Sequence, residues 1–519
     1  MYDEAFDERV ISSCREPFAH CLYPEMTINT PKPDLTSIAL SAMVNAGLAT
    51  DFTTEVLWEA QSLREPESEI KGSAEVRDMR EMLWSSIDNS ESRDLDQIEY
   101  VERLPDGRIR LLIGIADVDA FVPKGSAIDR RAFLNTVSVY TPAIIFPMLP
   151  EQLSTGITSL LEGEDRLALV IELALTSEGA VSSRNVYRAV VHNHAKLTYE
   201  EVGEWLENQS PIPASIANVP GLEEQVKLQA ETTGLLHALR KQNGALELET
   251  VEVEPVISGG EVIRLDIKRH NRAQQIIESF MIAANTAMAE FLEERGVPSL
   301  RRVVRTPERW NLIVKMAKSY GVKLTPRPDS RALSDFLARR KAKAPAGYAD
   351  LSLSILKMMG SGEYMVEAPG LDQEGHFGLA VHDYTHSTAP NRRYPDLITQ
   401  RCLKAVIGDK NFPYTREELE EIARRCNRME DAARKVERMT KKAAVAVLLG
   451  NHTGEIFDGI VTGVKEKGTF VRLVSPPADG RIVEGEDGLS VGDKVHVRLV
   501  STDPERGYID FANVGRESA

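Results

Sequence analysis

Cysteine is scarce in this sequence, and nothing in its placement indicates a metal site. The chain contains Cys14, Cys21, Cys402 and Cys426, with no C-x₂-C pair among them. Neither a zinc site nor a disulfide framework is therefore indicated, and reduced thiols are expected. No uncharged apolar run reaches the length of a membrane span, and the acidic N-terminus lacks a secretory apolar region. We expect a cytoplasmic protein with no membrane association.

Positive charge is also in deficit. The chain has 62 Lys and Arg against 79 Asp and Glu, a net charge of -17. This balance argues against indiscriminate binding to nucleic acid, although it leaves room for a local basic channel. The 519 residues, 42% of them hydrophobic and 27% charged, are typical of a soluble globular protein with more than one domain.

The N-terminal region, residues 1–74, is predicted to be a helical domain. Apolar residues recur at helical spacing from Asp34, and Asn45 to Leu48 has a glycine where a helix would end. Asp51 is expected to cap a second helix. Two helices joined by a short turn fit a helix-turn-helix module or a plain helical hairpin. Their role is left open between guiding RNA and covering one face of a larger domain. The absence of Lys and Arg from Leu35 to Ala60 argues against a DNA-recognition helix.

Residues 75–450 are predicted to form a mixed α+β domain, because long helical patterns interrupt strand patterns. The expected strands are Arg108–Val118, Leu167–Leu175, Val186–Asn193 and Val251–Ile257. The expected helices are Val76–Leu83, Tyr199–Leu206, Leu222–Asn243, Gln274–Glu294 and Thr415–Leu449.

Residues 451–519 change in character to short β segments separated by glycine and proline. The predicted strands are Phe457–Val464, Thr469–Val474, Lys494–Leu499 and Ile509–Phe511, and 476–480 is read as a turn. Several short strands in so small a segment suggest an OB-type β-barrel. Alternation alone does not exclude another small barrel or sandwich.

Three aspartates stand within nine residues in Asp88-x₅-Asp94-x-Asp96. Like charges so close together are unfavourable unless a cation neutralises them. Hard oxygen ligands suit Mg²⁺ or Mn²⁺, and a metal held in this way can activate water at a phosphate. A polar turn rich in Asn, Ser and Asp is the alternative interpretation.

A second informative segment contains Arg392 and Arg393 after a proline, with Tyr384 and Tyr394 on either side. Guanidinium groups offer planar paired donors to phosphate oxygens. The alternative interpretation is a surface ion-pair cluster, which adjacent arginines form more often than a phosphate site. Together with the carboxylates, the arginines provide what phosphodiester cleavage needs.

These segments resemble the ribonuclease II/R family, also called the RNB family. The resemblance rests on the motifs Ile87-Asp88-x₅-Asp94-x-Asp96, Ile115-Ala-Asp117, Ser138-Val-Tyr140, Phe146-Pro-Met-Leu-Pro150, Arg272–Asn285 and His376–Arg401. They follow the family's order over about residues 75–450. The C-terminal segment resembles the family's S1 RNA-binding domain through Gly459-x-Val461-x-Gly463 and Gly468-Thr-Phe470.

The resemblance implies a processive 3′→5′ hydrolytic exoribonuclease that degrades single-stranded RNA to nucleoside 5′-monophosphates and leaves a short oligonucleotide. It implies three catalytic residues, Asp96, Arg392 and Asp94, with Asp96 critical for cleavage. The implied ligands for Mg²⁺ or Mn²⁺ are Asp88, Asp94, Asp96 and Gln97. The implied RNA-binding residues are Tyr140, Arg392, Arg393, Glu437, Lys465, Lys467 and Phe470. A monomer is expected, and the sequence specifies no protein partner.

Some of these residues have a structural alternative. Tyr140 and Phe470 are equally compatible with core positions, and Glu437 with an ordinary helix pair to Lys441. The two barrel lysines, Lys465 and Lys467, are compatible with a solvated loop.

The sequence departs from the family pattern at several positions, among them Ala389, Asn391, Lys467 and Glu484, and three further departures affect the predicted site and domains. Gln97 stands where a fourth aspartate is usual in the family. This difference leaves three alternatives to an ordinary Mg²⁺ enzyme: weaker metal binding, a preference for Mn²⁺, or an inactive RNA-binding scaffold. No aromatic partner for Tyr140 is found in Glu247–Ile257. The N-terminal residues read as helical, whereas the family usually begins with two cold-shock domains.

Overall fold

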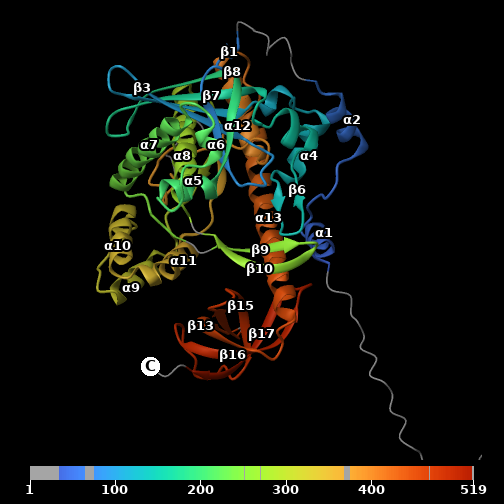
Figure 1. Cartoon of the computed structure of the whole chain (residues 1–519), viewed down its shortest axis with the longest axis vertical. Coiled ribbons are helices and arrows are strands. Elements are labelled where there is room, and N and C mark those ends of the chain that lie inside the picture. Colours follow the sequence, from blue (N-terminus) through green and yellow to red (C-terminus); the bar gives the residue numbers. More distant parts are fainter. Residues whose placement is uncertain are drawn as a thin grey trace, which may run out of the picture.

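The computed structural model describes residues 34–64, 75–249, 252–268, 270–367, 375–466 and 468–516. Within these ranges the chain folds into a large α+β body and a small β-barrel, and one long helix runs from the first to the second (Figure 1). The predicted α+β, multidomain fold class is confirmed. None of the described helices combines the length and the apolar character needed to cross a lipid bilayer.

A six-stranded sheet forms the centre of the α+β body, in the order β1-β8-β2-β3-β4-β7. Its strands are β1 (Arg77–Asp78), β2 (Trp84–Asp88), β3 (Gln97–Arg103), β4 (Ile109–Ala116), β7 (Asp165–Leu175) and β8 (Val181–Thr198). The long strand β8 pairs antiparallel with β7 over its first part and parallel with β2 over its last part. The sheet therefore curls back on itself, and its concave interior holds most of the main core.

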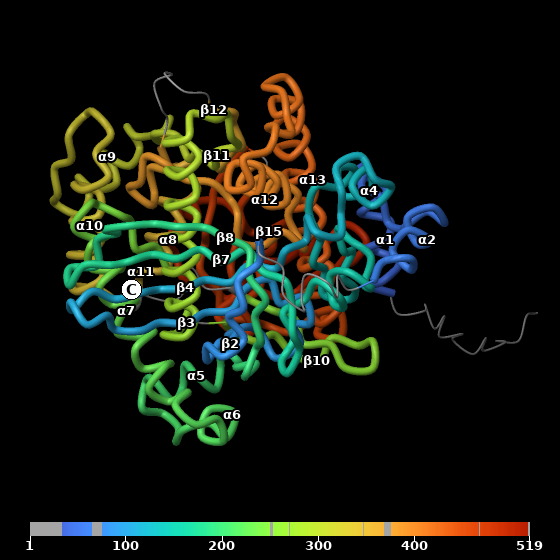
Figure 2. Tube along the Cα trace, turned by 90° about the horizontal axis from the view of Figure 1, so that it is seen from above, coloured from blue at the N-terminus to red at the C-terminus, as the bar shows by residue number. Residues whose placement is uncertain are grey.

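Helices cover this sheet and extend away from it (Figure 2). Those nearest the sheet are α5 (Tyr199–Leu206), α6 (Ala214–Ala217), α7 (Leu222–Asn243), α8 (Arg272–Glu294) and α12 (Tyr394–Ile407). Helix α7 packs on β3 and on α8, and α8 begins with a capping box between Asn271 and Gln274. Between α8 and α12 lie α9 (Trp310–Ser319), α10 (Ser330–Lys343) and α11 (Tyr348–Met359), which have a small core of their own.

Short elements complete the body. They are η1 (Val118–Ala120), α4 (Ala127–Asn135), β5 (Val139–Tyr140), β6 (Ile145–Phe146), η2 (Leu153–Ile157), β9 (Glu252–Ser258), β10 (Glu261–Lys268), β11 (Ser299–Val303), η3 (Pro345–Gly347) and β12 (Glu363–Glu367). Three antiparallel pairs form among them: β5 with β6, β9 with β10, and β11 with β12.

The C-terminal barrel is closed by five strands in the order β13-β14-β15-β17-β16. These are β13 (Ile456–Lys465), β14 (Gly468–Leu473), β15 (Asp479–Glu484), β16 (Lys494–Asp503) and β17 (Tyr508–Arg516). Only β15 and β17 pair in parallel, which is the connectivity of the OB fold. The predicted OB-type barrel is thus confirmed. Helix α13 (Arg416–Gly450) leads into it and packs on β16 and β17.

The two N-terminal helices, α1 (Leu35–Asn45) and α2 (Thr54–Ser62), pack on different parts of the body. Leu35 and Ile38 of α1 lie against Ala443 and Ala444 of α13, whereas α2 packs on α4 and contributes to the main core. Leu40, Val44 and Trp58 remain exposed, so only one side of each helix is covered. Within the described residues, α1 and α2 thus each lie against the rest of the fold.

Three local predictions were wrong. Val76–Leu83 contains the short strand β1 and turns, because its backbone pairs with β8. Thr53, and not Asp51, caps α2 by accepting a hydrogen bond from the Val56 amide. The segment 476–480, expected to separate two strands, contains the start of β15 at Asp479, and β15 pairs with β14 and with β17.

Candidate active site

The aspartate segment forms a loop between β2 and β3 that interior groups hold in place. Asp88 ends β2, and Gln97 begins β3. The Ser159 hydroxyl donates to the Arg93 carbonyl and accepts from the Leu95 amide, at 2.6 and 2.9 Å. Because the residues before and after Asp94 are both attached to Ser159, the backbone at Asp94 is fixed.

Asp96 is the most buried of the three aspartates, with 1% of its surface exposed. One carboxylate oxygen accepts from the Asn391 amide at 3.0 Å, and the other accepts from Nε of Arg392 at 3.3 Å. Burial raises the pKa of Asp96 to about 7, even though Arg392 and the Asn391 amide act in the opposite direction. A buried carboxylate of this kind favours a further cation beside it.

Asp94 connects the loop to β5. The Tyr140 hydroxyl donates to Asp94 Oδ2 at 3.1 Å, while the Tyr140 amide donates to Glu437 Oε1 at 3.0 Å. Burial raises the pKa of Asp94, and it raises those of Tyr140 and Glu437 as well. The side chain of Tyr140 is only partly buried, and its hydroxyl is bound to Asp94. Glu437 of α13 fixes the backbone of Tyr140.

Asp88 is partly exposed, and its carboxylate accepts from the Asn89 amide and the Ser92 hydroxyl. The three aspartates do not converge on one point. Among the described residues, the only three acidic or metal-binding side chains with ligand atoms all within 4.8 Å of one another are Glu293, Glu367 and Asp383.

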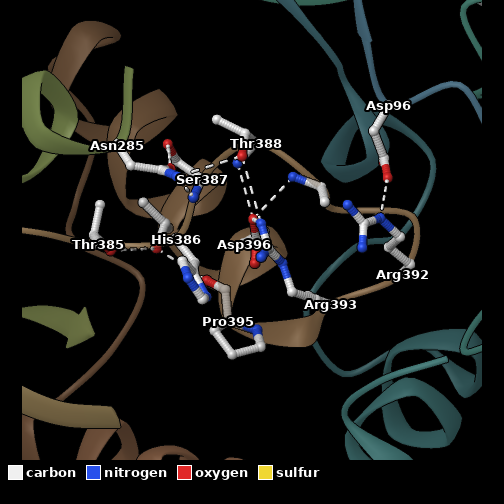
Figure 3. A network of polar contacts seen from close by, with 12 residues as sticks. Asp96, Asn285, Thr385, His386, Ser387, Thr388, Arg392, Arg393, Pro395 and Asp396 are labelled. Carbon is white, nitrogen blue, oxygen red and sulfur yellow. Dashed lines mark hydrogen bonds and ion pairs between the residues drawn. The ribbon is translucent and has the colours of Figure 1, made fainter. Parts of the chain in front are cut away.

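The two adjacent arginines have different surroundings (Figure 3). The side chain of Arg392 is 43% exposed and faces Asp96. Arg393 turns inward and donates at 2.7 Å to Asp396, whose side chain is fully buried. Asp396 also accepts from the Thr388 and Ala389 amides. Of the two predicted RNA-binding arginines, Arg392 is thus the more exposed, and Arg393 is paired with a buried carboxylate.

The donor set suits a hard divalent cation. Asp88, Asp94 and Asp96 provide carboxylate oxygens, and Gln97 adds a neutral amide oxygen on the same loop. Mg²⁺ and Mn²⁺ prefer oxygen ligands of this kind. Only Arg392 is in direct ionic contact with any of these carboxylates among the described ion pairs, so net negative charge remains on the loop.

The predicted RNA-binding residues of the barrel lie on its surface where they are described. Phe470 is half-buried and points away from the core, whereas its neighbour Val471 is fully buried inside. Phe470 pairs with Gly463 across the two strands, and a Cβ atom added at Gly463 would lie 3.9 Å from the Phe470 ring. Lys465 is exposed at the end of β13, and Lys467 lies outside the described residues.

Sequence reasoning gave no role to Asn391, Ser85 and Glu99. Asn391 supplies its amide to Asp96 and accepts from the Thr158 hydroxyl at 2.6 Å. Ser85 and Glu99 are fully buried on neighbouring strands. The sequence did contain a sign that Glu99 is unusual, because a charged residue stands there between the apolar residues of β3.

Comparison with known proteins gives a consistent result. A family model described as RNB domain matches residues 76–409, and one described as RNase II-type exonuclease C-terminal S1 domain matches residues 455–514. Ribonuclease R 1 of Lactococcus lactis is 29% identical over 91% of the chain and 60% of its own length. Ribonuclease R of Thermotoga maritima is 30% identical over 89% of the chain and 68% of its own length. The chain thus spans under two thirds of the first relative.

Solved structures share the fold. Mycoplasma genitalium RNase R in complex with ribose-methylated single-stranded RNA superposes with a TM-score of 0.83 at 24% identity, over 93% of this chain and 78% of that one. Yeast Ssd1, described as a pseudonuclease, gives a TM-score of 0.67 at 18% identity, over 90% and 58% of the two chains.

Proposed function

Because the chain belongs to the RNB-domain family, we propose that it is a metal-dependent exoribonuclease. It removes nucleotides processively from the 3′ end of single-stranded RNA, releases nucleoside 5′-monophosphates and leaves a short oligonucleotide. The relatives named ribonuclease R support this assignment, and the RNA-bound Mycoplasma enzyme supports the choice of single-stranded RNA as substrate.

The observation that carries the proposal is the contact between Asp96, on the loop that also carries Asp94, and Arg392 from a distant part of the chain. Asp96 is buried against the loop that carries Arg392, and Asp94 is held by Tyr140. A purely structural ion pair would not require an arginine side chain that is 43% exposed. The remaining donors of Arg392 are suited to a phosphate oxygen.

Each residue has a role in the proposed reaction. Asp88, Asp94, Asp96 and Gln97 would hold Mg²⁺ or Mn²⁺, which when bound activates water and stabilises charge on the phosphoryl group. Arg392 binds the phosphate next to the cut and neutralises charge that develops there. Tyr140 contacts the terminal nucleotide, and Glu437 positions Tyr140 through the backbone hydrogen bond.

The barrel is proposed to bind the incoming strand. Phe470 offers an outward aromatic face on which a base can stack, and Lys465 lies on the same strand pair. Substituting Phe470 by Ala should weaken binding of single-stranded RNA by about 1 kcal/mol, the low end of what one stacked base contributes. A matched Val474→Ala change, at an exposed apolar residue just past the end of β14, should leave binding unchanged.

A second candidate function is an RNA-binding scaffold without catalysis. Gln97 favours it, because a neutral amide lowers the charge available to a metal. The fold of a pseudonuclease such as yeast Ssd1 is compatible with it too. Against it stands the retention of three mutually repelling carboxylates together with Arg392.

A time course on 5′-labelled single-stranded RNA with Mg²⁺ or Mn²⁺ tests the two functions. The exonuclease produces a descending ladder that Asp96→Asn reduces by at least about 10³-fold, while RNA binding persists. Binding by the wild type without cleavage in either metal would instead establish the scaffold. In that case, cleavage gained by Gln97→Asp would identify the neutral amide as the cause.

A further inference from the structure

A lysine of strand β8 holds the part of the aspartate loop that follows Asp88. Its ammonium group, Lys196 Nζ, donates to the backbone carbonyls of Ser90 and Ser92 at 2.9 and 2.6 Å. Lys196 has no carboxylate partner among the ion pairs of the described residues, although the loop is acidic. The lysine therefore binds the backbone of the loop and none of its carboxylates.

The same turn orients the Asp88 carboxylate. Asp88 Oδ1 accepts from the Asn89 amide at 2.7 Å and from the Ser92 hydroxyl at 2.8 Å. The Ser92 amide donates to the Asn89 carbonyl at 3.2 Å and closes the turn. The residue whose hydroxyl reaches Asp88 is thus the residue whose carbonyl Lys196 binds.

The register of the sheet places Lys196 and Asp88 on one face. Strands β2 and β8 run parallel here, with Asp88 opposite Thr198 and Ser86 opposite Lys196. Directly opposite side chains point to the same side of a sheet, and so do residues two apart on one strand. The Lys196 side chain therefore reaches the turn from the face on which Asp88 stands.

Lys196 complements Ser159, which fixes the backbone at Asp94 through Arg93 and Leu95. Ser90 is exposed, so water is able to satisfy its carbonyl without a lysine. Holding a long lysine side chain in one geometry also costs conformational entropy. The contact is accounted for if the shape of the turn matters for the carboxylate beside it.

We propose that Lys196 is a positioning residue of the divalent-metal site. It fixes the turn at 89–92, so that the Ser92 hydroxyl holds the Asp88 carboxylate in one orientation. The inference rests on the proposed function, because it takes the aspartate loop to be a metal site. Lys196 itself binds neither the metal nor RNA, and it acts as the outer groups that orient metal ligands do.

The direct test is a titration of the RNA-free protein with Mn²⁺, followed by the electron paramagnetic resonance of the free ion. Lys196→Met removes the ammonium group and should weaken Mn²⁺ binding by about 10-fold. The sign is informative, because the loss of a nearby positive charge would by itself strengthen cation binding. Lys196→Arg keeps the donors and should restore most of the affinity. Lys227→Met, at an exposed lysine paired with Glu223, should have no effect.

A double-mutant cycle tests the route through Ser92. Ser92→Ala removes the hydroxyl that orients Asp88 and should also weaken Mn²⁺ binding, with Asp88→Asn as the positive control. Because both residues act on one carboxylate, the double variant Lys196→Met/Ser92→Ala should bind Mn²⁺ no more weakly than the weaker single variant. The affinity of Lys196→Met for RNA in EDTA should equal that of the wild type, while its kcat for cleavage falls.

Three results overturn the inference. The first is a Lys196→Met protein that binds Mn²⁺ as tightly as the wild type or more tightly. The second is full additivity in the double variant, or unchanged Mn²⁺ affinity in Ser92→Ala, which leaves the fold of the lysine variant out of the question. The third is a loss of RNA affinity in EDTA, which assigns Lys196 to a phosphate. Failure of the proposed function has a different signature, a wild type that binds Mn²⁺ and leaves RNA intact.

Discussion

Two clusters of acidic side chains in the described part of the chain differ in the cations that they contact. In the first, Glu293, Glu367 and Asp383 surround the buried guanidinium of Arg301, which lies 2.5 Å from Glu367 and 3.7 Å from Asp383. In the second, Asp96 contacts Arg392 at 3.3 Å, but Asp88 and Asp94 contact no cation among the described ion pairs. Close spacing of carboxylates is therefore not by itself a sign of a metal site, because Arg301 offsets part of the charge of the first cluster.

The largest effect is expected from removing the internal cation. Arg301→Met leaves Glu367 and Asp383 without their partner and should lower the free energy of unfolding by about 3 kcal/mol. Urea denaturation in EDTA measures the change. Arg305→Met, at a largely exposed arginine on the same segment, should cost under about 1 kcal/mol. Equal losses in the two variants would show that the first group does not depend on Arg301.

The adjacent residues Arg392 and Arg393 allow a second comparison, between a partly exposed and a mostly buried arginine of one loop. Arg392→Ala should reduce RNA cleavage by about 100-fold with little change in melting temperature, because its partly exposed side chain serves the ligand. Arg393→Ala should lower the free energy of unfolding by about 3 kcal/mol, because it leaves the buried carboxylate of Asp396 without its cationic partner. Cleavage rates and thermal melts of both variants are needed. The reverse pattern would exchange the two roles.

Metal-dependent stabilisation separates the two groups directly. Mn²⁺ at about 100 times its dissociation constant should stabilise the wild type by about 2.7 kcal/mol. Asp94→Asn should lose most of this gain, and Asp383→Asn should keep it, because Arg301 and not a metal serves that group. Melting curves with and without Mn²⁺ give the result. A gain lost in Asp383→Asn would move the metal to the other group.

The last expected effect is a pH dependence of stability, which is small per pH unit. In metal-free protein the pKa of Asp96 lies at about 7, above its ordinary value of 3.8. The native state then binds more protons than the unfolded state between these values, so stability falls as pH rises, by up to about 1.4 kcal/mol per pH unit. Asp96→Asn should flatten this slope between pH 4 and 7 in EDTA. Identical slopes in the two proteins would contradict the raised pKa.

Much of the secondary structure followed from local patterns. The helices Tyr199–Leu206 and Leu222–Asn243 begin and end where the periodicity predicted. Predictions failed where long-range pairing decides the conformation, as for β1, which forms only because β8 lies beside it. The site was predictable to the extent that its motifs are contiguous. Local patterns could not show that Asn391, far along the chain, binds Asp96 through its backbone.

The sequence by itself determined the order of the domains, the barrel and the residue types of the site, because periodicity and motif spacing are local properties. Only the tertiary structure decided which charges meet. Arg392 and Arg393 are neighbours in sequence, yet one faces Asp96 and the other faces the buried Asp396. Likewise, Glu99 is an ordinary residue in the sequence, and only the packing of β2 against β3 leaves its carboxylate buried without a partner. Burial and pairing depend on the whole fold, so no local pattern contains them.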